Sequence, residues 1–470
     1  MDTHTDGLVV AYVGGGSREW APKLVTDLAR CESLSGTVRL HDVDREAAER
    51  NARFGNWVED REEAAGNWTY EAVHDLGDAL EGADFVVFST QFDPAETFVH
   101  DLDVPREHGI YGAVAATIGP GGMFRAMRTM PVYREFAAAV REHCPDAWVF
   151  NYTNPVTFVT RALYEEYPDI NAVGLCHEVF GLQSTLADLV AEYLDAERPS
   201  REDIEVNVKG INHFTWVDEA RWRGRDLLDL VDRHVEREGV VREYSAEELE
   251  DASGFVDNDQ VTWELYERFG ILPAAGDRHL VEFAPWFIRG GKEGLNRWGV
   301  KRTPSEYRAR HWEEDDTDHQ TTNVEALMDE EAFELTETGE VTVDLMRALV
   351  GLEPFVTNVN LPNRGQMDDV ERGAVVETNA RFTADSATPL VAGTLPRPLH
   401  GLVSTHVENQ ETLVEAAFEG DLDRAYEAFL CDPQVLALDP DDARDLFRDL
   451  VAAEREYLTD WNLDDAAVLD

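Results

Sequence analysis

The sequence predicts an α/β protein whose first part is a doubly wound parallel sheet. Four short apolar runs, at residues 9–13, 38–41, 84–88 and 148–150, alternate with segments of helical pattern. Each run ends in glycine or in small polar or acidic residues. Strands that alternate with helices are joined by right-handed crossovers, so their carboxyl ends gather at one edge of the sheet. Ligands bind at that edge.

The first run leads directly into Gly14, Gly15, Gly16 and Ser17, and a helix is predicted to begin near Glu19. Glycines let the backbone turn tightly and approach a pyrophosphate, whose charge then lies against the N–H groups that open the helix. Glu19 stands where a G-x-G-x-x-G pattern has its last glycine, so an ordinary tight turn is the alternative interpretation.

The later runs bring polar side chains to the same edge. Asp42 follows the second run, where dinucleotide-binding folds hold the carboxylate that accepts the ribose hydroxyls. Ser89 and Thr90 follow the third run, and Asn151 ends the fourth. Together with the glycines, Asp42, Ser89 and Thr90 predict a Rossmann-type dinucleotide-binding domain.

The composition is strongly acidic. There are 41 Lys+Arg residues against 95 Asp+Glu, for a formal net charge of −54, and most of the basic residues are arginine. Nucleic acid is therefore not an expected partner. The acidic residues are dispersed, and with 43% hydrophobic residues the chain has enough apolar side chains for a core. Such an anionic surface is typical of a halophilic protein, which concentrated salt screens.

The N-terminus has no basic segment followed by an apolar segment, and no apolar run is long enough to span a bilayer. We therefore expect a cytoplasmic protein with no membrane contact. The cysteines show no paired spacing, which argues against a disulfide framework. They are Cys31, Cys144, Cys176 and Cys431.

The length predicts two domains. Residues 1–200 would form the dinucleotide-binding domain, and 196–200 resemble a connector. Residues 201–470 would form a C-terminal α+β lobe for substrate and metal binding and for oligomerisation. An acidic run at 313–318 is most simply a solvated loop.

Two later segments carry residues suited to a metal ion. A strand fragment at 173–175 ends in Cys176, and His213 lies in a second apolar stretch. A thiolate and an imidazole both bind divalent transition metals, and a site with few protein ligands leaves positions open for substrate oxygens. Each residue alone is more often structural, since a buried cysteine behaves as a small hydrophobe and a lone histidine is usually hydrogen-bonded in the core.

A set of motifs, in order along nearly the whole chain, resembles the family 4 glycoside hydrolases. These are NAD- and metal-dependent glycosidases related in fold to lactate and malate dehydrogenases. The matching segments are 14–17, 119–128, 151–155, 176–179, 210–213, 279–286 and 359–365.

The resemblance implies roles for several residues. Cys176 and His213 match the metal ligands, usually for Mn²⁺. Asn154 matches a substrate-binding asparagine beside the nicotinamide of NAD+. His177 lies where other members place the group that protonates the leaving oxygen. The family's base falls near Asp277, with His279 as the second choice.

The implied reaction explains why one site needs both cofactors. NAD+ accepts a hydride from C3 of the sugar, a base removes the proton at C2, and the metal stabilises the resulting enolate. The aglycone leaves C1 by elimination, water adds, and the hydride returns to C3. Such enzymes are exceptions to the two-carboxylate mechanism.

The substrate implied by the motif at 176–179 is an α-glucoside or an α-galacturonide. Arg125 or Arg278 could bind a uronate carboxylate through a bidentate pair, although a single arginine is more often in an ordinary ion pair. The resemblance also implies a homodimer or homotetramer. The alternative function is an NAD-dependent 2-hydroxy-acid dehydrogenase of the lactate/malate type, which has no use for a metal thiolate.

Overall fold

The computed structural model describes residues 4–91, 94–239, 244, 248–249, 258–305, 323–329 and 333–470. The acidic run predicted as a loop at 313–318 lies outside these residues.

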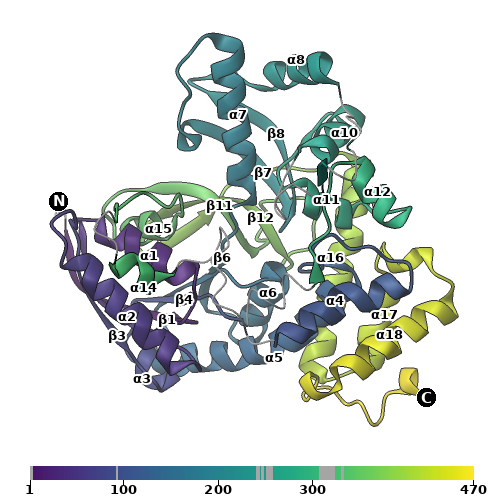
Figure 1. Cartoon of the computed structure of the whole chain (residues 1–470), viewed down its shortest axis with the longest axis horizontal. Coiled ribbons are helices and arrows are strands. Elements are labelled where there is room, and N and C mark those ends of the chain that lie inside the picture. The colour runs from purple at the N-terminus through teal and green to yellow at the C-terminus, as the bar shows by residue number, and fades with distance from the viewer. Residues whose placement is uncertain are drawn as a thin grey trace.

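A large sheet organises the first half of the chain and confirms the predicted α/β class (Figure 1). Within the described residues it has nine strands in the order β13-β12-β11-β6-β5-β4-β1-β2-β3. Strands β1 to β6 are all parallel, and their order 3-2-1-4-5-6 is that of dinucleotide-binding folds. They are β1 (Thr5–Val13), β2 (Leu34–His41), β3 (Asn67–Ala72), β4 (Phe85–Phe88), β5 (Trp148–Asn151) and β6 (Asn171–Gly174).

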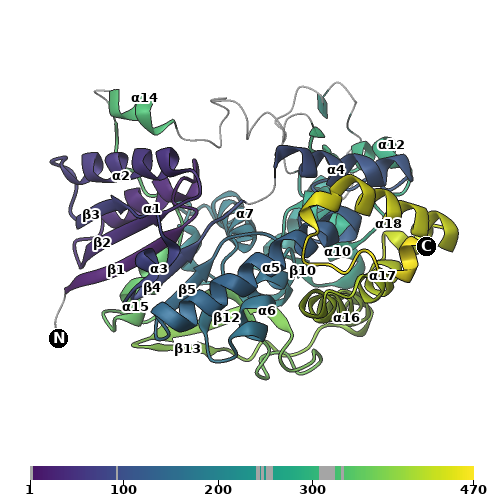
Figure 2. The same ribbon diagram turned by 90° about the horizontal axis from the view of Figure 1, so that it is seen from below.

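Alternate side chains of β1 enter two different cores. Val10 and Tyr12 pack with the helices on one face, while Ala11 and Val13 pack with those on the other. Figure 2 shows α1 and α2 on one side of the strands and α5 on the opposite side. A strand buried on both faces has to be apolar throughout, which is why β4 and the second half of β1 read as continuous apolar runs. The helices are α1 (Trp20–Ala29), α2 (Arg45–Glu59), α3 (Leu76–Leu80), α4 (Ala95–Glu107), α5 (Gly119–His143), α6 (Val156–Glu166) and α15 (Thr342–Leu349).

Three strands from the second half of the chain extend this sheet, which the sequence did not predict. They are β11 (Phe355–Pro362), β12 (Val375–Thr383) and β13 (Ser386–Pro389). β11 is antiparallel to β6, where Asn360 pairs with Gly174, and β12 and β13 continue the antiparallel run. The sheet thus crosses the expected domain boundary near residue 200.

A smaller antiparallel sheet carries part of the candidate site. β7 (Ile204–Ile211) and β8 (Phe214–Trp222) form a hairpin, β10 (Leu272–Pro273) pairs with β8 on one side, and the short β9 (Arg225–Asp226) pairs with its end. The helices near it are α7 (Glu178–Leu194), α8 (Leu228–Glu238), α10 (Gln260–Phe269), α11 (Asp277–Phe283) and α12 (Gly291–Arg297).

The C-terminal helices pack against α4 and α5, at the right of Figure 1. A buried ion-pair cluster ties them together: Arg128 of α5 donates to Asp101 of α4 at 2.8 Å and to Glu454, the last residue of α18 (Pro440–Glu454). No helix in the described part of the chain is long and apolar enough to span a bilayer. The remaining helices are α14 (Val324–Asp329), α16 (Arg397–Glu419), α17 (Leu422–Leu430) and α18 (Pro440–Glu454).

Candidate active site

The glycine segment lies at the carboxyl end of β1, where the strand order reverses between β1 and β4. Gly14 has φ +90, and a Cβ atom there would lie 2.0 Å from the carbonyl oxygen of Ser89. Only glycine therefore allows the chain after β1 to pass so close to the chain after β4. Ser89 and Thr90 stand beside this turn, since the Ser89 N–H donates to Val13 and the Thr90 N–H to the Thr153 hydroxyl.

Asp42, at the end of β2, contacts the same glycine turn. Its Oδ2 accepts the N–H of Gly16 at 2.8 Å, and its Oδ1 accepts the N–H of Asp44 at 2.9 Å. Asn51 of α2 donates to the carbonyl of Gly15 at 2.8 Å, and the Ser17 hydroxyl accepts the N–H of Trp20 at the start of α1. The predicted cofactor residues, which follow β1, β2 and β4, are thus brought together beside the N-terminus of α1.

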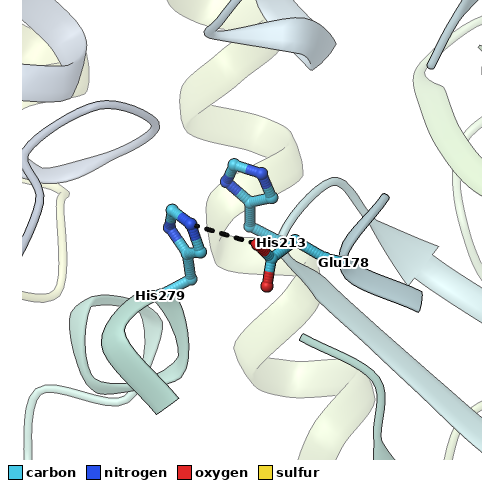
Figure 3. Close-up of side chains that lie close together, drawn as sticks. All are labelled: Glu178, His213 and His279. Carbon is cyan, nitrogen blue, oxygen red and sulfur yellow. Dashed lines mark ion pairs between the residues drawn. The ribbon is translucent and has the colours of Figure 1, made fainter. Parts of the chain in front are cut away.

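Three side chains that are far apart in the sequence form a cluster of metal-binding donors (Figure 3). Glu178 opens α7, His213 lies in the β7–β8 turn, and His279 lies in α11, and their ligand atoms are all within 4.8 Å of one another. The Glu178 carboxylate is 3.7 Å from Nε2 of His279 and accepts the N–H of Gly276 at 2.6 Å. The two histidine rings stack with centroids 3.8 Å apart.

His213 stands in a position that usually requires glycine. Ile211 pairs with Phe214, so Asn212 and His213 form a two-residue hairpin turn, and His213 has φ 63. Its Nδ1 is 2.7 Å from the hydroxyl of Thr117, which leaves Nε2 as the nitrogen available to a ligand. Burial and the neighbouring His279 hold the pKa of His213 well below its usual value, so the ring is neutral and can donate a lone pair.

Cys176 lies two residues before Glu178, just after β6. Burial and the carboxylates of Glu377 and Glu178 raise the pKa of its thiol, while a hydrogen bond from Asn212 opposes that rise. A divalent cation would have to displace the thiol proton on binding. His213 is thus one of the three clustered donors, whereas the sulfur of Cys176 lies outside the group whose ligand atoms are all within 4.8 Å of one another.

Asp277 is buried at the first position of α11 and faces the start of α10. Its Oδ2 accepts the N–H of Val261, and its Oδ1 accepts both the N–H and the hydroxyl of Thr262, each at 2.9 Å. These bonds satisfy N–H groups that a helix start otherwise leaves unpaired. His279, two residues later, is instead one of the three donors of the cluster.

Glu282 and Arg278, also on α11, contact segments from elsewhere in the chain. Glu282 accepts the N–H groups of Val114 and Ala115 at 2.8 Å and so holds the loop that carries Thr117. Burial raises the pKa of this carboxyl, and the neighbouring Arg278 opposes that rise. Arg278 also donates to the hydroxyl of Thr303.

The remaining predicted residues lie around these two centres. Half of the His177 side chain is exposed; its ring stacks on Trp20, and its Nδ1 is 3.8 Å from Glu340. Asn154, after β5, has a buried Oδ1 without a hydrogen-bond partner among the described residues. Arg125 of α5 is largely buried, donates to Gln91 at 3.1 Å, and is among the charges that act on His213.

Sequence reasoning missed four residues of the site. Glu178 stood in the motif at 176–179 without a role, although its carboxylate is a common metal ligand. Thr117, Glu282 and Glu377 lie in segments whose contacts with the site are long-range in sequence, so no local pattern indicated them.

Models of known families match most of the chain. A model described as family 4 glycosyl hydrolase matches residues 9–192, and one described as its C-terminal domain matches residues 208–435. An alpha-galacturonidase of Thermoanaerobacterium saccharolyticum is 43% identical over 98% of this chain and 99% of its own.

Solved structures have the same fold. The crystal structure of the Bacillus subtilis protein lplD superposes with a TM-score of 0.86 at 40% identity, covering 95% of this chain and all of that one. A 6-phospho-alpha-glucosidase from gut microorganisms, in complex with NAD and Mn²⁺, has a TM-score of 0.77 at 20% identity, over 96% of this chain and 99% of its own.

Proposed function

The chain belongs to the family 4 glycosyl hydrolases, and from that premise we propose that it is an α-galacturonidase working with bound NAD+ and a divalent cation such as Mn²⁺. One observation supports the two cofactors. The same protein has a cluster of metal-binding donors (Glu178, His213 and His279) and a glycine turn that is suited to a dinucleotide. The name of the relative that is 43% identical supports the galacturonide.

The described residues fit both cofactors. Residues Gly14 to Ser17 and Asp42 would hold the dinucleotide, and the orphaned Oδ1 of Asn154 would meet the nicotinamide or a sugar hydroxyl. His213 and Glu178 would hold the cation together with Cys176, which lies two residues before Glu178. When bound, NAD+ would accept the C3 hydride and the cation would stabilise negative charge on the C2 and C3 oxygens.

Proton transfer at C2 requires a base, for which Asp277 and His279 are the candidates. The oxygens of Asp277 already accept three hydrogen bonds from α10, whereas His279 lies in the donor cluster. The geometry therefore favours His279 over Asp277. His177, which is half exposed and whose charge acts on His213 of the donor cluster, would protonate the leaving oxygen.

Arg125 is the better candidate for the uronate carboxylate. Its charge acts on His213, so it lies within electrostatic reach of the cluster. Arg125 donates to Gln91, and Arg278 donates to Thr303 and lies beside Glu282, so both guanidinium groups have protein partners. A guanidinium and a carboxylate form a bidentate pair that a neutral sugar lacks, so Arg125 would discriminate galacturonides from galactosides and glucosides.

A substrate panel tests the proposal. Nitrophenyl α-galacturonide, α-galactoside and α-glucoside, their β-anomers and 2-hydroxy acids are assayed with NAD+, Mn²⁺ and reductant in molar salt. We expect hydrolysis of the α-galacturonide without net NADH release. Faster hydrolysis of the α-glucoside would contradict the substrate, and steady NADH formation from a 2-hydroxy acid would favour the dehydrogenase.

A variant pair tests Arg125 in the same assay. Arg125→Lys keeps the charge but loses the planar pair, so kcat/KM for the galacturonide should fall by roughly 10-fold or more, the equivalent of one charged hydrogen bond. Arg134→Lys, on an exposed part of the same helix, is the matched control. Equal loss on neutral sugars would contradict a role in carboxylate recognition.

We also propose that the enzyme works as a homo-oligomer in a salt-rich cytoplasm. The net charge of −54 supports a salt-rich environment, and membership of the family supports the homo-oligomer. Size-exclusion chromatography with light scattering in molar salt measures the assembly.

A further inference from the structure

A buried carboxyl group that the proposed reaction does not use lies behind the candidate metal centre. Glu377, on β12, is 1% exposed. Its Oε1 accepts the side-chain amide of Asn358 at 2.7 Å, and its Oε2 accepts that of Asn212 at 3.2 Å. In the described part of the chain its hydrogen-bond donors are amides, with Asn360 nearby as a third.

These amides belong to the neighbourhood of the two predicted metal ligands. Asn212 directly precedes His213, and its amide also reaches the Cys176 thiol. Asn358 lies 3.4 Å from the backbone carbonyl of Cys176. One carboxylate therefore links the segment of Cys176 to the turn of His213, although it comes from a strand far away in the sequence.

The turn of His213 needs such support. A residue other than glycine at φ 63 is strained and persists only where its surroundings hold it. Thr117 holds the imidazole ring through Nδ1. The backbone of the turn is held on the other side through the Asn212 side chain, and Glu377 is the group that receives that side chain.

The geometry points to Glu377 as a positioning residue of the metal centre, which acts through Asn212 to keep His213 and Cys176 in one coordination geometry. The proposal rests on the proposed function, because it assumes that a cation binds at this centre. Outer partners of this kind typically change metal affinity by 10–100-fold.

The test measures cation affinity rather than activity alone. Glu377→Met removes both acceptor oxygens at similar volume, and we expect Mn²⁺ affinity, measured from the spin-resonance signal of free Mn²⁺, to fall by about 10–100-fold. Glu377→Gln keeps one acceptor and should restore part of that loss. The affinity for NAD+ should not change, and saturating Mn²⁺ should return kcat toward the wild-type value.

Glu411→Met is the matched control. Glu411 is also a shielded carboxyl with a raised pKa, but it pairs with Arg161 on α6. Its loss should lower thermal stability without changing Mn²⁺ affinity. If Glu377→Met does not fold, Asn212→Ala cuts the same link within the turn and should weaken Mn²⁺ binding to a similar extent.

Two outcomes overturn the proposal: a folded Glu377→Met protein with wild-type Mn²⁺ affinity, or a Glu377→Gln protein no better than Glu377→Met. Failure of the proposed function looks different, since the wild-type protein would then show no Mn²⁺ binding or no glycosidase activity in the same measurements.

Discussion

Asp277 illustrates how a single carboxylate near a reaction centre can serve the fold. It accepts three hydrogen bonds at the start of α10, which makes it a helix cap. In Asp277→Asn the new amide would face the N–H of Val261 or Thr262. We expect the unfolding free energy to fall by about 1–3 kcal/mol, because a buried donor loses its acceptor.

The same variant tests the identity of the base. In solvent deuterium, elimination should place deuterium at C2 of the product sugar. Asp277→Asn should retain that incorporation, and His279→Gln should lose it. Loss in Asp277→Asn at full Mn²⁺ occupancy, with retention in His279→Gln, would return the role to Asp277.

Cys176 is expected to be the most consequential thiol. Cys176→Ser should reduce Mn²⁺-dependent turnover by more than the roughly 100-fold that an outer partner can cost, since a direct ligand is lost. NAD+ binding, measured by titration, should stay intact. Cys144→Ser is the control, because burial, with a smaller contribution from the Glu81 carboxylate, raises the pKa of Cys144 to about 12 and the residue packs in the core of the large sheet. Near-normal turnover of Cys176→Ser would contradict the metal assignment.

Among the elements, α5 depends on a contact from the C-terminal region. The N–H of Gly119 at its start donates to Asp432, which is fully shielded from solvent. Burial raises the pKa of Asp432 from 3.8 to about 6, so the folded protein keeps a proton that the unfolded chain has already lost. The unfolding free energy should therefore fall as the pH rises from about 4 to about 6, by roughly 3 kcal/mol from this group.

Asp432→Asn removes this titration. Urea unfolding at pH steps between 4 and 7 should show a shallower decline than in the wild-type protein. Asp439→Asn, an exposed cap of α18, should keep the wild-type slope. An unchanged slope in Asp432→Asn would contradict the burial argument.

At this scale, the parts of the fold with local signals were predictable. The strand at Trp148–Asn151 and the helix Trp20–Ala29 follow from their apolar runs and from the glycines between β1 and α1. The pairing of β11 with β6 was not, because nothing in either sequence specifies a partner so far along the chain. Thr117 and Glu377 were missed for the same reason: each meets the site only through the tertiary fold.

For the molecule as a whole, the net charge of −54 dominates the electrostatics. Low salt lengthens the range of repulsion between carboxylates, from about 3 Å at 1 M to about 30 Å at 0.01 M. The melting temperature should therefore fall as salt is diluted, and calorimetry between molar and millimolar KCl measures it. A melting temperature independent of salt would contradict a halophilic adaptation.

β11 is synthesised long after β6, and this delay affects how the sheet forms during translation. While the ribosome is still synthesising the second half, β6 has no neighbour on its outer side, and its backbone groups form an open edge of the kind that pairs with other chains. The nascent Rossmann sheet is complete only after Phe355–Pro362 has emerged and reached back to it. Emergence of β11, rather than the end of the first lobe, is then the point at which this edge of the sheet is protected from pairing with other chains.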